Sequence, residues 1–244
     1  VPYKLLIKNE KPEKILNELW SIMIKESKPV AILIEENSIT GQAVQKYFSK
    51  EQYETREQMI KTIVNNTDIN DVFVATTGKT GRELFEIRNK RNQGSCDFLT
   101  VGGMGHASSI ALGIAIQKQN KHIFCLDGDG ALLMHMGALA TIGKISPKNL
   151  IHILLNNFSH DSVGGQPTGS ENIDFELLVK ACGYKSYQKI LKSQILASYL
   201  SKIKEKEGPH FIEIFISPGS RKDLGRPNIT PINNKINFMN NLNK

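Results

Sequence analysis

Short apolar runs alternate with longer amphipathic stretches along most of the chain. Continuous apolar runs without polar alternation are typical of strands that helices cover on both faces. Such runs predict strands over Val30–Ile34, Val72–Ala75, Phe98–Thr100, Ile123–Leu126, Leu150–Leu155 and Phe211–Ile216. The stretches between them predict helices over Pro12–Glu26, Arg56–Asn65, Gly105–Gln117, Ala131–Ile142, Phe175–Ala181 and Lys192–Lys206. This alternation predicts an α/β fold with a mostly parallel sheet flanked by helices.

The predicted elements divide the chain into three parts. Residues 1–45 hold one helix and one strand, which is too little for a domain. They are interpreted as the tail of a second α/β domain followed by a linker, for which the polar stretch Glu35–Tyr53 is the candidate. Residues 46–225 carry a complete α/β domain. The Asn-rich residues 226–244 are expected to form a C-terminal arm that lies on the surface or on a partner subunit.

The charge balance favours anionic partners. The chain carries 31 Lys and Arg against 24 Asp and Glu, a formal net charge of +7, which suits phosphate-bearing small molecules. The basic residues are spread without an aromatic-interleaved stripe, which argues against nucleic acid. No apolar run approaches the roughly 20 residues of a membrane span, so no membrane partner is expected. Cys96, Cys125 and Cys182 are too widely spaced for a metal knuckle or a disulfide framework, which predicts a reducing, cytoplasmic location.

The segment Asp127–Gly130 follows a predicted buried strand, and Asn157 follows the next strand along the chain. Because the carboxyl ends of parallel strands meet at one edge of the sheet, we expect Asp129 and Asn157 to lie close together. A carboxylate and an amide oxygen, with a loop carbonyl near Ser159, suit Mg²⁺. The glycines around Asp129 let backbone N–H groups approach a diphosphate. The residues alone therefore predict a Mg²⁺–diphosphate site, with a plain turn as the alternative.

This pattern resembles the signature of the thiamine-diphosphate enzymes, in which Gly-Asp-Gly is followed, after a gap like this one, by Asn-Asn. The resemblance implies a thiamine-diphosphate-binding fold whose diphosphate-binding domain holds thiamine diphosphate and Mg²⁺. The implied metal ligands are Asp129, Asn157 and the main-chain carbonyl of Ser159. The loop around Met104 resembles the one that lies under the cofactor rings, where Met104 would force the V shape and the Gly102 carbonyl would accept a hydrogen bond from the pyrimidine amino group. The implied cofactor-binding residues are Thr77, Gly78, Gly102, Met104, Gly128, Asp129, Gly130, Ala131 and Asn157.

Longer segments narrow the resemblance to the phosphonopyruvate decarboxylase branch of the 2-oxo acid decarboxylases. They are DFLTVGGMGHASSIALG at 97–113, LDGDGALLMHMGAL at 126–139 and NNFSHDSVGGQPT at 156–168. Thr76–Glu86 resembles the segment that opens their diphosphate-binding domain, although they carry Ser in place of Gly81, and Asp223–Pro227 resembles their tail. The resemblance implies decarboxylation of 3-phosphonopyruvate, an anionic 2-oxo acid, to phosphonoacetaldehyde and CO₂ in phosphonate biosynthesis.

Three alternatives to that branch remain. Sulfopyruvate decarboxylase, through its beta-type subunit, is the close relative. A non-catalytic cofactor-binding module is the second. A Rossmann-type dinucleotide binder is disfavoured, because the nearest approach to its glycine pattern, Gly103-Met104-Gly105, lacks the third glycine.

The family activates its cofactor with a Glu from the pyrimidine-binding domain, usually of the neighbouring subunit. This chain holds only the closing helix and strand of such a domain, and Glu35 and Glu36 come too late in it, so they are interpreted as linker charges. With Val1 in place of an initiator Met, this implies a C-terminal fragment of a longer enzyme or one half of a split one. The resemblance implies a homo-oligomer or a split-subunit hetero-oligomer, and we expect the isolated chain to be inactive.

Four histidines require separate interpretations. His106 and His160 fall on loops expected to face the cofactor, which makes them candidates for substrate contact or proton transfer. His135 is expected on a helix and is left open between the core and the site. His152 lies inside a buried strand and is expected to be a hydrogen-bonded core histidine. The activating catalytic residue itself is not identified within the chain.

Overall fold

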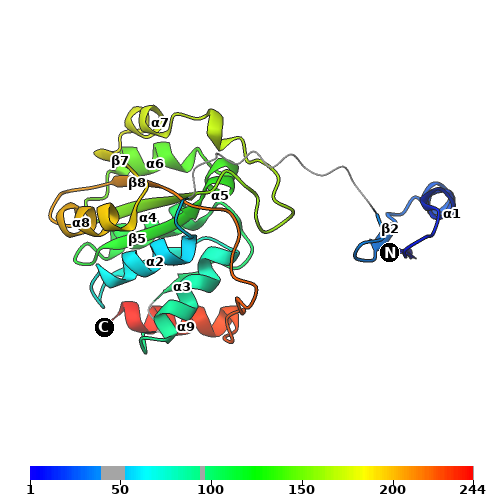
Figure 1. The fold of residues 1–244 in the computed structure, drawn as a ribbon, viewed down its shortest axis with the longest axis horizontal. Coiled ribbons are helices and arrows are strands. Elements are labelled where there is room, and N and C mark those ends of the chain that lie inside the picture. The colour runs from blue at the N-terminus through cyan, green and yellow to red at the C-terminus, as the bar shows by residue number, and fades with distance from the viewer. Residues whose placement is uncertain (40–52, 94–96, 244) are drawn as a thin grey trace. The chain divides into compact units, whose positions relative to one another are not determined.

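The computed structural model describes residues 1–39, 53–93 and 97–243 (Figure 1). They belong to two compact units, Val1–Gln45 and Lys46–Lys244, which we describe separately. Cys96 and most of the predicted linker lie outside the described residues. Among the described residues, none of the helices combines the length and the apolar character that a membrane crossing requires.

The first unit is a small β–α–β arrangement. Strand β1 (Tyr3–Leu6) and strand β2 (Ala31–Ile34) pair in parallel, and helix α1 (Pro12–Glu26) connects them. Its small core consists of Leu6, Ile15 and Leu19. The expectation of a single strand in this part was wrong, because a four-residue strand at the start of the chain is too short to give a clear pattern.

The second unit contains a six-stranded sheet whose strands are all parallel within the described residues. The strand order is β4-β3-β5-β6-β8-β7. The strands are β3 (Val72–Ala75), β4 (Phe98–Leu99), β5 (Ile123–Gly128), β6 (Leu150–Asn156), β7 (Ser186–Ile190) and β8 (His210–Phe215). The predicted α/β class with a mostly parallel sheet is confirmed.

Helices cover both faces of this sheet (Figure 1). One face packs against α2 (Arg56–Asn65), α3 (Lys79–Asn89) and α8 (Ser193–Ile203). The other face packs against α4 (Ala107–Gln117), α6 (Ala138–Ile145) and α7 (Phe175–Cys182). Because both faces are covered, the central strands are buried along their whole length, which explains their continuous apolar sequence.

The predicted helix Ala131–Ile142 is wrong as a single element. The structure has a short helix α5 (Asp129–Met134), an interruption, and then α6 (Ala138–Ile145). Helix α5 ends at Met134, because the backbone of His135 is no longer helical, and Gly137 follows as a weak helix former. His135 therefore lies at the end of α5 and not on a continuous helix.

The predicted C-terminal arm contains a further helix, α9 (Pro231–Leu242). Thr230 caps it by accepting a hydrogen bond from Asn233 N. The Phe238 ring meets the Phe98 ring edge-on at 5.5 Å, and Asn234 Oδ1 accepts a hydrogen bond from Leu99 N. Helix α9 thus packs onto the edge strand β4, the position where a sheet needs protection from unwanted pairing. The 3₁₀ turn η1 (Ser170–Asn172) lies in the loop before α7.

Candidate functional site

A cavity of about 330 Å³ lies at the carboxyl ends of β3, β5 and β6. The strand that follows β3 in the chain, β4, lies on one side of the β3–β5 pair, and the strand that follows β5, β6, lies on the other side. The connections after β3 and β5 therefore leave in opposite directions. Open α/β sheets form ligand crevices at such a switch point. Most of the lining residues come from the loops and helix starts after these three strands, and Arg56 of α2 and Met104 of the loop after β4 complete the lining.

Most of the residues predicted for the site line this one cavity. They are Thr77, Gly78, Met104, Gly128, Asp129, Gly130, Ala131, Asn157, Ser159 and His160. Gly102 and His106 are not among the lining residues. The structure therefore brings the two strand-end motifs together, while the functional roles of these residues stay predictions.

Asp129 begins helix α5 and is 3% exposed. Its Oδ2 accepts hydrogen bonds from Thr168 Oγ1 at 2.5 Å and from Ser170 Oγ at 3.0 Å. Burial raises the pKa of Asp129, although these two hydrogen bonds act in the opposite direction. A carboxylate held in such surroundings favours a nearby cation, because a buried charge is costly unless it is paired.

Asn157 and Ser159 are fixed by the loop that follows β6. Asn157 Oδ1 accepts a hydrogen bond from Ser159 N at 3.1 Å, and Asn157 Nδ2 donates to Asp161 Oδ2 at 2.8 Å. The Ser159 carbonyl accepts from Asp161 N at 2.9 Å and has a second lone pair available. Within the described residues, the buried Ser159 Oγ has no hydrogen-bond partner.

A chain of buried hydrogen bonds supports Asp129 from behind. Ser170 Oγ, the donor to Asp129, also lies 3.1 Å from Asn156 Oδ1, and Asn156 Nδ2 donates to Glu213 Oε1 at 2.8 Å. Tyr187 OH donates to the other Glu213 oxygen at 2.5 Å. This support was not predicted, although Glu213 inside the apolar run Phe211–Ile216 was a signal.

Two cationic residues of the cavity were also missed. Arg56 is buried and donates through Nε and Nη2 to Glu83, and its Nη1 lies 3.6 Å from Asp161 Oδ2. Lys79 Nζ donates to the Asp161 carbonyl at 3.1 Å. Lys79 begins α3, a helix that the sequence pattern did not predict. Arg56 falls in the first turn of a predicted helix, where charged residues are ordinarily solvent-exposed.

The histidines differ in their surroundings. His160 lies against Gly130, where an added Cβ would come within 2.6 Å of the His160 ring and would displace it. The His106 ring meets the His135 ring edge-on at 4.1 Å. His152 is fully buried, and its Nδ1 lies 3.0 Å from Tyr184 OH, as expected for a hydrogen-bonded core histidine.

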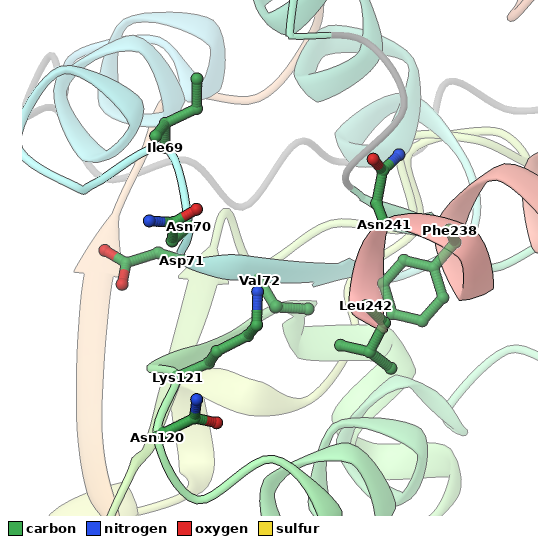
Figure 2. A pocket seen from close by; sticks show the side chains of 9 residues that line it. All are labelled: Ile69, Asn70, Asp71, Val72, Asn120, Lys121, Phe238, Asn241 and Leu242. Carbon is green, nitrogen blue, oxygen red and sulfur yellow. The ribbon is translucent and has the colours of Figure 1, made fainter. Parts of the chain in front are cut away.

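A second cavity of about 400 Å³ lies at the other end of the sheet, before β3 and β5. Figure 2 shows Phe238 and Leu242 of α9 on one side of it and Asp71 and Lys121 on the other. Asp71 is the acid of this cavity, and it is already paired, because its Oδ2 accepts from Lys204 Nζ at 2.8 Å and its Oδ1 lies 3.4 Å from His122. The cavity contains none of the predicted site residues.

The contacts of Asp71 with His122 and Lys204 make the stability of the fold depend on pH. Burial would raise the pKa of Asp71, but hydrogen bonds from His122 and Lys204 outweigh it and lower that pKa below its ordinary 3.8. The same hydrogen bond raises the pKa of His122 above 6.5. Asp71 therefore stabilises the fold above pH 3.8 and loses this effect as pH falls through its folded pKa, whereas protonated His122 stabilises it below pH 6.5 and loses this effect as pH rises through its folded pKa.

Asp71→Asn is therefore expected to lower the free energy of unfolding by about 2 kcal/mol near pH 5.5, where both partners are charged. The loss should shrink at about pH 9, where only Lys204 remains charged, and disappear at about pH 2. Urea unfolding at the three pH values measures it. Glu207→Gln, which removes one partner of an exposed ion pair with Lys148, is the control and should have little effect. A pH-independent loss would contradict the assignment.

A cavity at the switch point of a parallel sheet, with a carboxylate and an amide beside glycine-rich turns, is typical of α/β proteins that bind a phosphorylated cofactor with a divalent metal. Residues 76–214, more than half of the chain, match the family model for the thiamine pyrophosphate enzyme, C-terminal TPP binding domain, and the chain belongs to that family.

The chain is similar to two kinds of characterised decarboxylase. It is 39% identical over 158 residues to phosphonopyruvate decarboxylase of Streptomyces viridochromogenes, covering 65% of this chain and 38% of that protein. It is 32% identical over 190 residues to sulfopyruvate decarboxylase subunit beta of Methanococcus maripaludis, covering 78% of this chain and 98% of that subunit. The chain thus spans well under half the length of the first relative.

A solved structure of a putative thiamin diphosphate-dependent enzyme from Mycobacterium smegmatis matches with a TM-score of 0.57 and 17% sequence identity. The match covers 76% of this chain and 36% of that one. At this identity the likeness shows the shared fold alone.

Proposed function

We propose that this chain is the thiamine diphosphate- and Mg²⁺-binding part of a phosphonopyruvate decarboxylase, which converts 3-phosphonopyruvate to phosphonoacetaldehyde and CO₂ in phosphonate biosynthesis. The observation that supports it most directly is the convergence of Asp129, Asn157 and Ser159 in one cavity, in a chain 39% identical to such an enzyme. The net charge of +7 suits a strongly anionic 2-oxo acid.

The residues of the cavity fit a Mg²⁺-bound diphosphate. Asp129 Oδ, Asn157 Oδ1 and the Ser159 carbonyl are oxygen donors, the kind that Mg²⁺ prefers. Two buried hydroxyls that line the cavity, Thr76 Oγ1 and Ser159 Oγ, have no hydrogen-bond partner in the described part of the chain. Gly78 has φ +99°, and an added Cβ would lie 3.1 Å from Ser162 Oγ, so this position favours glycine, whose backbone can approach a ligand closely.

In this proposal each part of the cavity has its own task. Asp129, Asn157 and the Ser159 carbonyl hold the metal. Backbone N–H groups of the turns after β3 and β5 hold the diphosphate, and Met104 provides apolar contact for the rings. Bound thiamine diphosphate supplies the electron sink for decarboxylation. The binding residues proposed for the turns after β3 and β5 and for the loop around Met104 are Thr77, Gly78, Gly102, Gly128, Gly130 and Ala131.

His160 and His106 are the proposed residues for proton transfer or substrate contact. His160 lines the cavity beside Gly130. His106 lies two residues after Met104, and its ring meets the His135 ring edge-on. Histidine is the side chain that most often transfers protons in enzymes, which is why these two rings are proposed.

We further propose that the first unit is the closing part of a pyrimidine-binding domain, whose activating Glu reaches the site from a neighbouring subunit. A parallel sheet of two strands is not expected to be stable alone, and parallel sheets are normally covered on both faces. Here large apolar side chains remain exposed on the strands and on α1. They are Tyr3, Leu5, Leu33, Leu16, Trp20 and Ile24.

A cytoplasmic location agrees with the free thiols of Cys125 and Cys182. For assembly, the relative from Methanococcus maripaludis is itself named as a subunit, which favours a multi-subunit enzyme. Because this chain spans 98% of that subunit, sulfopyruvate decarboxylation is the second candidate function.

The test compares the chain alone with the chain fused behind the amino-terminal part of the Streptomyces viridochromogenes relative, with thiamine diphosphate and Mg²⁺ present. We expect no turnover by the chain alone and a kcat/KM at least tenfold higher for phosphonopyruvate than for sulfopyruvate in the fusion. A preference for sulfopyruvate would replace the substrate. Turnover by the chain alone would contradict the need for a second domain, and cofactor binding without turnover in the fusion would indicate a binding module.

A further inference from the structure

We propose that a separate cavity beside the cofactor site binds a tetrahedral oxyanion through Arg82 and Arg226. This cavity, of about 360 Å³, lies on the other side of the Thr77–Gly78 turn, between the start of α3, the end of β4 and the C-terminal tail. Thr77 and Gly78 line both cavities, so the oxyanion would be bound directly beside the proposed diphosphate site.

The first observation is that both guanidinium groups are unpaired. Arg82 is half-buried on α3 and Arg226 is exposed in the tail, and in the described parts of the chain neither side chain has a hydrogen bond or an ion pair. The other buried or half-buried arginines all form ion pairs with acidic side chains. Those pairs are Arg56–Glu83, Arg88–Asp97 and Arg221 with Glu57, Glu86 and Asp223.

The second observation is an unsatisfied hydroxyl in the same cavity. Thr100 Oγ1 is buried at the end of β4 and has no hydrogen-bond partner among the described residues. A hydroxyl in this position is expected to find a partner, because leaving a buried polar atom unpaired is costly. An oxyanion accepting from Thr100 and from both arginines would satisfy all three groups.

The electrostatics of the cavity select for an anion. Its lining residues include two arginines and no acid. The nearest acids of α3 are already engaged, Glu83 by Arg56 and Glu86 by Arg221 and Gly225 N. Guanidinium groups bind tetrahedral oxyanions through parallel N–H···O bonds, so phosphate, phosphonate and sulfonate are the suitable class.

The remaining walls suit a ligand with a short carbon chain. Leu99, Val101, Ile229 and the two prolines Pro227 and Pro231 surround the polar end. Arg226 belongs to the tail segment that resembles the decarboxylases but lies beyond the matched residues 76–214. The tail segment Asp223–Pro227 would then contribute to binding.

The binding test uses the chain as it is, without turnover, and methylphosphonate as the probe. Broadening of its ³¹P signal on addition of protein measures the affinity, which should fall at least about tenfold in Arg82→Gln and in Arg226→Gln. Lys79→Gln is the matched control, because Lys79 lies one turn away on the same helix but lines only the cofactor cavity. Lys222→Gln controls for charge in the tail.

Several outcomes would overturn the site. They are no binding by the unaltered chain, unchanged affinity in both arginine variants with circular dichroism confirming their fold, or a loss in Lys79→Gln that equals the loss in Arg82→Gln. Arg82→Lys should recover part of the affinity, since it restores the charge but not the planar fork.

A second measurement distinguishes the two sources of such an oxyanion, and this part rests on the proposed function. In the fusion enzyme, two results together would assign the site to the phosphonate end of the substrate. Methylphosphonate would inhibit competitively, and Arg82→Gln would raise the KM for phosphonopyruvate more than it lowers kcat. Non-competitive behaviour would overturn that assignment and leave a separately bound phosphate as the ligand. Because the binding test needs no turnover, failure of the proposed function would leave its result unaffected.

Discussion

Asp129→Ala is expected to abolish Mg²⁺-dependent binding of thiamine diphosphate, with an affinity loss of at least about 100-fold. Asp129 is the only carboxylate among the three proposed metal ligands, and it is held at the carboxyl end of β5 by Thr168 and Ser170. Folding should survive, because Thr168 Oγ1 and Ser170 Oγ also lie 2.9 Å from each other and can pair without it. Calorimetric titration of the cofactor, with Mg²⁺ and with a chelator, measures the effect.

The control for this variant is Glu171→Ala, which removes an exposed negative charge from the neighbouring turn η1 without touching the cavity. It should bind the cofactor as the unaltered chain does. Removal of Mg²⁺ by the chelator should reproduce the loss seen in Asp129→Ala, and it should add nothing further in that variant. Normal Mg²⁺-dependent binding by Asp129→Ala would show that the metal is held elsewhere.

The part of the site that could be predicted from the sequence depends on strand ends. Asp129 and Asn157 follow buried strands with continuous apolar sequences, so their positions were fixed once a parallel sheet was inferred. Arg56 could not be assigned in this way, since its pairing with Glu83 joins residues on two helices that meet only in the folded chain. His106 precedes α4 as expected, but its ring meets the His135 ring and it is not among the residues that line the cavity, so its role stays a prediction.

The fold, too, could be predicted only where the sequence pattern reveals which residues are buried. Strands β5 and β6 are buried on both faces, so their sequences are continuously apolar and were recognised. Strand β7, with the sequence SYQKI, is an edge strand that is only partly buried, and its polar residues concealed it. Helix α3 begins KTGRE, and this polar start with a glycine hid the apolar face formed by Leu84, Phe85 and Ile87.

Gly143→Ala is expected to destabilise the second unit by about 3 kcal/mol. Gly143 lies on α6 where it crosses the end of α7, and an added Cβ would lie 1.6 Å from the Cys182 carbonyl oxygen and 3.1 Å from the Gly183 Cα. Both neighbours are backbone atoms and cannot move aside by a change of rotamer. The two helices must separate, which opens the core around Ile142 and Val179.

The sign of this prediction separates close packing from helix propensity, because alanine normally stabilises a helix relative to glycine. Gly113→Ala on α4 provides the comparison, since an added Cβ there meets no atom within 4 Å. It should raise the free energy of unfolding by about 0.5 kcal/mol, the opposite sign to Gly143→Ala. Urea unfolding followed by circular dichroism measures both. A stabilised Gly143→Ala variant would mean that α6 and α7 do not approach backbone to backbone.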